Sequence, residues 1–184
     1  MIRARALFDA TVLPHLDAAY SLARFLARDA DAAEDIVQEA MLRAFRGFDG
    51  FRGGDARAWL LAIVRNCARS WAAARPRAAA GAAEEGGPED PWDREAETPE
   101  ASLARGDEIA AVRALVAALP EPFRETLVLR ELEDLSYRDV AAVTGVPVGT
   151  VMSRLARARA LFGAAWRRRF GEESLPVPKE HETP

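Results

Sequence analysis

Apolar residues recur every three or four positions over most of this chain, which is the spacing of one face of an α-helix. No stretch shows the strict alternation of apolar and polar residues that a half-buried strand requires. The pattern predicts helices near residues 4–27, 31–46, 55–74, 108–118, 121–132, 136–144 and 148–168. We therefore expect an all-α protein whose helices fall into two groups.

Between the two groups the helical periodicity is lost. Residues 79–107 are rich in alanine, glycine, proline and glutamate, and they contain two basic and nine acidic residues, a composition typical of a flexible linker. We therefore interpret residues 1–77 and 108–170 as two small helical domains. A flexible acidic linker at 78–107 joins them, and a disordered tail follows at 171–184. Whether the linker is more than a tether is left open.

The charge of the chain is unevenly distributed. The formal net charge is −4, yet six arginines and no acidic residue lie between Val140 and Phe170. A local basic patch of this kind indicates nucleic-acid binding, although a solvated basic helix would have the same composition.

The remaining composition excludes several classes of protein. No window approaches the roughly 18 continuous apolar residues of a membrane span, and the N-terminus lacks the apolar core of a signal peptide. We therefore expect a cytoplasmic protein without membrane insertion. A single cysteine, Cys67, with only His15 and His181 elsewhere, predicts no internal disulfide, no metal site and no cofactor.

Residues 135–155 carry the signals of a helix-turn-helix. Ser136 followed by Asp139 is typical of a helix start, Gly145 can adopt the left-handed conformation that ends a helix, and Pro147 favours a new start. In the second helix an apolar stripe is expected to be buried, comprising Val151, Leu155, Ala158 and Phe162. The outward face is then Thr150, Ser153, Arg154 and Arg157, residue types that meet bases and phosphates in a major groove. An ordinary helical hairpin in a bundle is the alternative.

The predicted helix 31–46 has one broad apolar face, formed by Ile36, Val37, Ala40, Met41, Ala44 and Phe45. Its opposite face carries Asp35, Gln38, Glu39 and Arg46, with Leu42 in their midst. An apolar side chain ringed by polar ones is typical of a binding hot spot for a protein partner. The alternative is that one exposed leucine has no function.

The predicted helix 55–74 also has two different faces. Its apolar face comprises Ala56, Leu60, Ile63, Val64, Cys67 and Trp71, and its opposite face comprises Trp59, Arg65, Asn66 and Arg69. The arginines, the amide and the aromatic ring of the second face would suit an unpaired nucleic-acid strand. The glycine-rich loop 47–54 before this helix holds Phe48 and Phe51. The alternatives are that Trp59 belongs to the core and that Cys67 is merely a small buried hydrophobe.

These motifs together resemble the extracytoplasmic-function (ECF) sigma factors of bacteria. The similar stretches are Asp35-Ile-Val-Gln-Glu-Ala, Phe48-Asp-Gly-Phe-Arg-Gly, Ala58-Trp-Leu-Leu-Ala-Ile-Val-Arg-Asn, Leu119-Pro-Glu-Pro-Phe-Arg-Glu, Leu129-Arg-Glu-Leu and Gly149-Thr-Val-Met-Ser-Arg-Leu-Ala-Arg-Ala-Arg. The resemblance covers roughly residues 8–75 and 108–165 and departs from the family in the high glycine content of the loop 47–54.

The resemblance implies a non-enzymatic factor that binds core RNA polymerase and directs promoter-specific initiation. It implies partners in the β′ clamp helices, the β flap tip, promoter DNA and a cognate anti-sigma factor. By this likeness the polymerase-binding residues are Asp35, Gln38, Glu39 and Leu42. The residues at the −10 element are Phe51, Arg65, Asn66 and Arg69, and those at the −35 element are Thr150, Ser153, Arg154 and Arg157.

Two other classes of function stay open at this point. A helix-turn-helix regulator that binds operators alone would explain residues 136–165, but it leaves the 31–46 helix and the aromatic loop without a role. A helical enzyme has little support, because His15 and His181 lie near opposite ends of the chain and no metal-ligand spacing is present.

Overall fold

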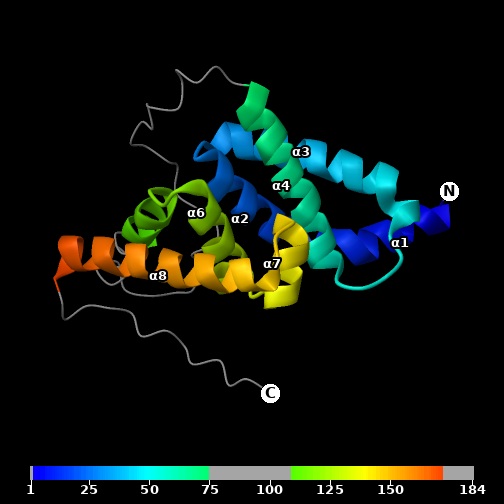
Figure 1. Cartoon of the computed structure of the whole chain (residues 1–184). Helices are drawn as coiled ribbons and strands as arrows, with labels where there is room; N and C mark the ends of the chain where they lie inside the picture. Colours follow the sequence, from blue (N-terminus) through cyan, green and yellow to red (C-terminus); the bar gives the residue numbers. More distant parts are fainter. Residues whose placement is uncertain (1, 75–108, 172–184) are drawn as a thin grey trace, which may run out of the picture.

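The computed structural model describes residues 2–74 and 109–171, and the expectation of an all-α fold is confirmed: these residues form helices and turns and no strand (Figure 1). Residues 78–107, interpreted above as an acidic linker, and 172–184 of the predicted tail lie outside the described residues.

The first group of helices comprises α1 (Ile2–Val12), α2 (Leu16–Ala27), α3 (Ala30–Gly47) and α4 (Ala56–Ala74). The prediction of one continuous helix over 4–27 is wrong, because a 3-10 turn at Leu13–His15 separates α1 from α2. Pro14 in that turn lacks a backbone N–H and clashes with the preceding turn of an α-helix, so the helix cannot continue through it.

Small side chains allow α2, α3 and α4 to pack closely. Five alanines of α2 and α3 have no exposed surface, namely Ala19, Ala23, Ala33, Ala40 and Ala44. The larger buried residues, Leu22, Leu60, Leu61 and Val64, fill the space between these contacts. The connection from α2 to α3 is tight: Arg28 adopts a left-handed conformation with φ 60°, and the Asp29 side chain caps α3 by accepting a bond from the Ala32 amide at 3.0 Å.

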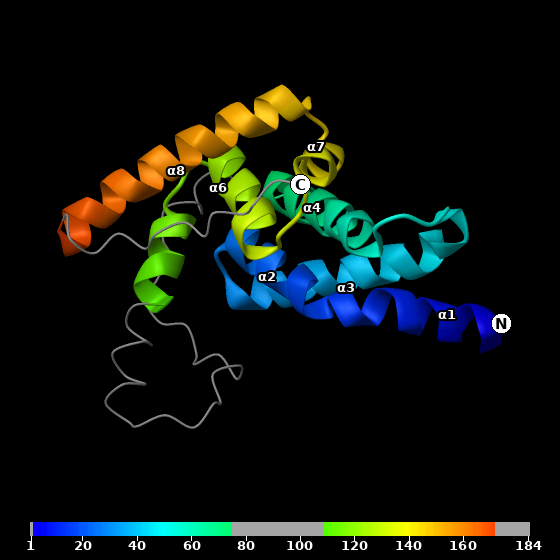
Figure 2. The same ribbon diagram turned by 90° about the horizontal axis from the view of Figure 1, so that it is seen from below.

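The second group contains helical residues 109–117, α6 (Glu121–Leu127), the π-helical turn η4 (Val128–Leu132), α7 (Tyr137–Thr144) and α8 (Val148–Phe170). The predicted helix 121–132 is thus an α-helix that ends in a π turn. Figure 2 shows α8 lying across α6, with α7 at its N-terminal end.

The signals of the helix-turn-helix act as predicted. The Ser136 hydroxyl accepts a bond from the Asp139 amide at 3.2 Å and so caps α7, while Gly145 ends α7 with φ 70°. Pro147 immediately precedes α8. Val151, Leu155 and Ala158 of the predicted apolar stripe are buried, whereas Phe162 is only half-buried.

The two groups pack against one another in this structure. α7 lies beside α4 and α6 lies beside α2 in both views (Figures 1 and 2). The buried residues of the two groups form one continuous cluster. A guanidinium of Arg28 at the end of α2 also donates to the carbonyl of Leu119, 3.4 Å away, just before α6.

Candidate functional site

The outward face of α3 has the polar character that its sequence predicts. Asp35, Gln38 and Leu42 are exposed, and the Leu42 side chain keeps 46% of its surface accessible. Glu39 is half-buried and accepts a bond from Arg43 Nε at 2.6 Å. This pair raises the pKa of Arg43, because the neighbouring carboxylate favours the charged guanidinium. The face therefore presents one apolar side chain among charged and amide groups.

A groove of about 410 Å³ runs beside this face, between α1 and α3. It is lined by Arg5, Phe8, Asp9, Gln38, Met41, Leu42 and Phe45. The expectation that Phe45 is buried is wrong, since 54% of its surface is exposed. Sequence reasoning also missed the residues that α1 contributes. The sequence did contain a signal for this groove. The apolar positions 41, 42 and 45 span a wider arc of the helix circumference than a single buried stripe covers.

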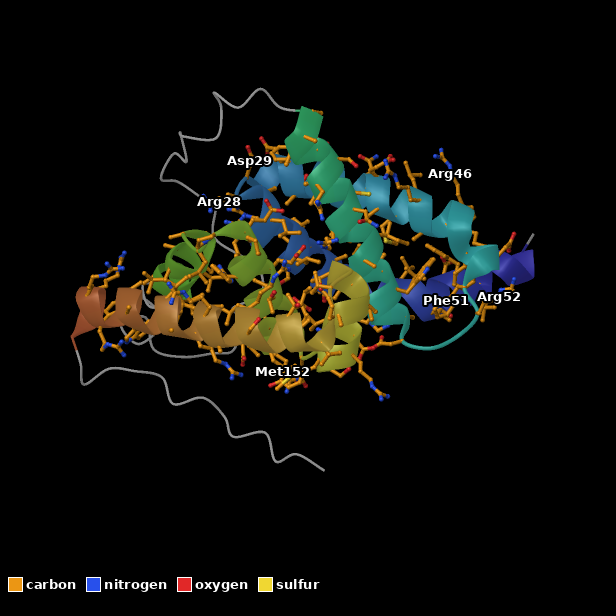
Figure 3. All side chains as sticks on the ribbon, in the orientation of Figure 1. Arg28, Asp29, Arg46, Phe51, Arg52 and Met152 are labelled. Carbon is orange, nitrogen blue, oxygen red and sulfur yellow. The ribbon has the colours of Figure 1, made fainter. Side chains whose placement is uncertain are left out.

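An aromatic cluster joins the loop after α3 to α4. Phe48 and Phe51 stack with ring centroids 6.0 Å apart, and Phe51 lies 5.1 Å from the Trp59 ring. Gly53 and Gly54 follow with φ values of 88° and 94°, a conformation that residues with a side chain rarely adopt. Figure 3 shows Phe51 and Arg52 on this loop, at the end of the molecule near α1. The half-buried Phe51 and Trp59 thus support each other at the start of α4.

The predicted strand-binding face of α4 is only partly accessible. Asn66 and Arg69 are exposed, as expected. The expectation that Arg65 faces away from the core is wrong: it is 9% exposed and forms an ion pair with Glu125 of α6. A second arginine that sequence reasoning missed, Arg57, belongs to the same helix and bonds to a carboxylate of the second group. Neither contact has a local sequence signal, because the partners are 60 and 76 residues away.

The outward face of α8 contains the four residues predicted for it. Ser153 and Arg157 are exposed and Thr150 and Arg154 are half-buried, with the Ser153 hydroxyl bonded to the Thr150 carbonyl at 3.0 Å. Within the described ranges 2–74 and 109–171, Arg154 and Arg157 form no ion pair, so both guanidinium groups can meet an external anion.

Met152, which the sequence reasoning did not single out, lies on the same part of α8. It is 54% exposed and points away from the neighbouring helices (Figure 3). Its apolar side chain beside two hydroxyl groups and two arginines widens the range of groups that this face can contact, including the methyl group of thymine.

Arg124 of α6 has a structural role, because it bonds to the turn that precedes this helix. It is 5% exposed, and its Nη1 donates to the carbonyls of Ala117 and Leu119 at 2.9 and 3.1 Å. Burial, reinforced by the nearby Arg28, lowers the pKa of Arg124 to about 10, so the group is still charged at neutral pH. It holds the turn in place and is not available to a ligand.

The described part of the chain provides no residues for a reactive cysteine, a metal site or a membrane span. Cys67 is a free, buried cysteine whose pKa burial raises, in agreement with its interpretation as a small hydrophobe. Residues 2–74 and 109–171 contain no group of histidine, cysteine and acidic side chains that could hold a metal ion. Among the helices described, none has the length and apolar character needed to cross a membrane.

Comparison with known proteins assigns the family. Residues 11–77 match "Sigma-70 region 2" and residues 109–162 match "Sigma-70, region 4". The chain is 39% identical over 161 residues to the RNA polymerase sigma-H factor of Pseudomonas aeruginosa, covering 83% of this chain and 82% of the relative. It is 34% identical over 147 residues to the ECF RNA polymerase sigma-E factor of Haemophilus influenzae, with 77% of each chain covered. The chain belongs to the ECF sigma factors.

The fold of this sigma factor agrees with that assignment. The sigma factor RpoE of Bartonella quintana, solved in complex with the anti-sigma factor NepR, superimposes with a TM-score of 0.70 and 27% identity, covering 87% of this chain and 96% of that one. The two helical groups are thus regions 2 and 4 of a sigma factor that directs RNA polymerase to promoters.

Proposed function

We propose that this ECF sigma factor acts by positioning and strand capture, with each exposed face assigned to one partner. Region 2, which we place at residues 1–77, binds the β′ clamp helices through Asp35, Gln38, Glu39 and Leu42. Region 4, placed at 108–170, binds the β flap tip. The polymerase supplies all covalent chemistry, so this chain needs no catalytic residue, and it works in the cytoplasm with its polymerase.

The observation that carries the polymerase contact is the groove between α1 and α3. It is lined by Phe8, Met41 and Phe45 together with charged and amide side chains, the composition of a surface that buries one side of a partner helix. Leu42 also lines the groove and keeps nearly half of its surface exposed.

Two further faces are assigned to promoter DNA. Phe51, Asn66 and Arg69, together with Arg65 when it is freed from Glu125, hold the unpaired strand at the −10 element. The aromatic cluster supports this, because stacked rings next to arginines suit unpaired bases. Thr150, Ser153, Arg154 and Arg157 read duplex DNA at the −35 element, supported by the unpaired guanidinium groups on α8.

Control by a cognate anti-sigma factor is the remaining part of the proposal. The RpoE of Bartonella quintana, similar over most of its length, is in complex with such a factor. A small inhibitor that covers α3 and α8 would block both polymerase and DNA. Purification at native levels should recover it; repeated recovery of polymerase alone would count against this part.

The experiment that tests the function compares DNA binding with and without core polymerase. Promoters are first identified by aligning the sequences upstream of transcripts that overexpression induces. In a gel-shift assay the duplex should be retarded specifically only when core polymerase is present, and run-off transcripts should start at the aligned promoters. Specific binding to duplex by the chain alone, as a dimer, would instead indicate a helix-turn-helix regulator.

A further inference from the structure

Between the described parts of region 2 and region 4, two ion pairs are formed, and both arginines come from the same helix. Arg57 Nη2 of α4 lies 2.6 Å from Glu133 Oε2 in the loop after η4. Arg65, further along α4, bonds through Nε and Nη2 to the two carboxylate oxygens of Glu125 on α6. Region 4 therefore contributes both carboxylates, and α4 contributes both guanidinium groups.

These contacts are withdrawn from water. Glu125 and Glu133 are each 3% exposed and Arg65 is 9% exposed, whereas the Arg57 side chain retains 32% of its surface. The loss of hydration opposes the attraction of such pairs, so a buried ion pair contributes little net stability while both partners are present. Removal of one partner leaves the other charge buried and unpaired, which strongly favours separation of the two surfaces.

A carboxylate and a phosphodiester offer a guanidinium the same chemistry, namely anionic oxygens that accept two parallel N–H bonds. Arg65 receives this bidentate contact from Glu125. Asn66 and Arg69, the neighbours of Arg65 on α4, are exposed and free to contact a nucleic-acid strand. Arg57 and Arg65 thus have anionic partners within the protein, while Asn66 and Arg69 of the same helix remain open.

We propose that the free protein is closed on itself, with Glu125 and Glu133 occupying the positions that backbone phosphates of the −10 strand take on Arg65 and Arg57 in the open form. The inference rests on the proposed function, because it takes α4 as the strand-binding helix, and it adds Arg57 to that surface. Closure and strand binding exclude each other. If the closed form outnumbers the open form about tenfold, the apparent affinity for a strand falls by the same factor.

The test uses the full chain and two double variants that break the same contacts from opposite sides. Glu125→Gln/Glu133→Gln removes the carboxylates, and Arg57→Gln/Arg65→Gln removes the guanidinium groups. The matched control, Glu121→Gln/Glu131→Gln, removes two exposed carboxylates of region 4, and the one ion pair it breaks, Glu131 with Arg159, lies within region 4. Small-angle scattering gives the radius of gyration, and fluorescence anisotropy with a labelled single strand of dT gives the affinity. Circular dichroism checks the helical content.

Both double variants should open and expand, yet they should differ in binding. Glu125→Gln/Glu133→Gln should bind dT about tenfold more tightly than wild type. Arg57→Gln/Arg65→Gln should bind dT no more tightly than wild type. The control should match wild type in size. An unchanged radius of gyration in both double variants overturns the closure, and expansion without a gain in affinity overturns the competition. Promoter-directed transcription by wild type with core polymerase tests the proposed function separately.

Discussion

Phe8 of α1 and Phe45 of α3 meet edge to face, with ring centroids 5.2 Å apart and an angle of 87° between the ring planes. Phe8 is buried while Phe45 is largely exposed, so the pair connects the core of region 2 to the surface groove. Phe8 also meets Phe48 at 5.3 Å, which connects α1 to the loop before α4. One ring thereby supports both the groove and the aromatic cluster.

Replacing Phe8 with alanine should therefore destabilise region 2 by about 3 kcal/mol, the lower end of the range for a buried phenylalanine. Denaturant unfolding followed by circular dichroism measures the loss. Leu7→Ala is the matched control, because Leu7 is 60% exposed on the same helix and should change stability little. Equal losses in the two variants would mean that Phe8 is not part of the core.

Replacing Leu42 with aspartate should weaken binding to core polymerase without a change in helical content. A desolvated hot-spot side chain contributes on the order of 2 kcal/mol, which corresponds to a loss of roughly 30-fold in affinity. Co-purification and a titration with labelled protein measure the effect. Leu7→Asp introduces the same charge outside the residues that line the groove and should leave binding intact. Wild-type affinity in Leu42→Asp would show that the face is misassigned.

Arg154→Ala and Arg157→Ala should separate base reading from phosphate contact. A guanidinium that bonds guanine discriminates by about 1–3 kcal/mol, so its loss flattens the preference at one position of a library randomised at −35. A guanidinium bound only to phosphate weakens all sequences alike and reduces the log–log salt slope by about 1. Each holoenzyme is assayed across a salt series. If both variants keep the wild-type base preference at −35 and the wild-type salt slope, the DNA binds another face of α8.

Ser136→Ala should lower the stability of region 4 by about 1 kcal/mol, because the Asp139 amide loses its cap at the start of α7. Thermal unfolding measures the change. Ser70→Ala is a suitable control, since Ser70 is exposed near the end of α4 and bonds only to the Asn66 carbonyl within its own helix. If Ser136→Ala is as stable as this control, the cap does not contribute to the stability of region 4.

Local chemistry explains which features could be predicted from the sequence. The limits of α7 depend on Ser136 and Gly145, whose effects operate within a few residues, and the buried stripe of α8 follows from helical spacing alone. The break at Pro14 is equally local, but apolar residues continue on both sides of it and the periodicity conceals the interruption.

The contacts between the two regions could not be predicted from local sequence signals. A helical projection places Arg65 opposite the apolar face of α4, and this would be correct for region 2 alone. Region 4 supplies a second surface, and the pairing of Arg65 with Glu125 depends on tertiary packing across 60 residues of sequence. The groove has the same origin, because α1 lines one side of it and gives no hint of that role in its own pattern.

The alanines between α2, α3 and α4 restrict how this protein can change over evolutionary time. Ala19, Ala33 and Ala40 have no exposed surface and belong to the core in which these helices pack. Every amino acid that one nucleotide change in an alanine codon can produce, apart from glycine, is larger than alanine. Because overpacking a close contact costs about 1–3 kcal/mol, nearly all spontaneous replacements there are harmful. Drift in this protein is therefore expected to concentrate on its exterior, while these inner positions stay unchanged.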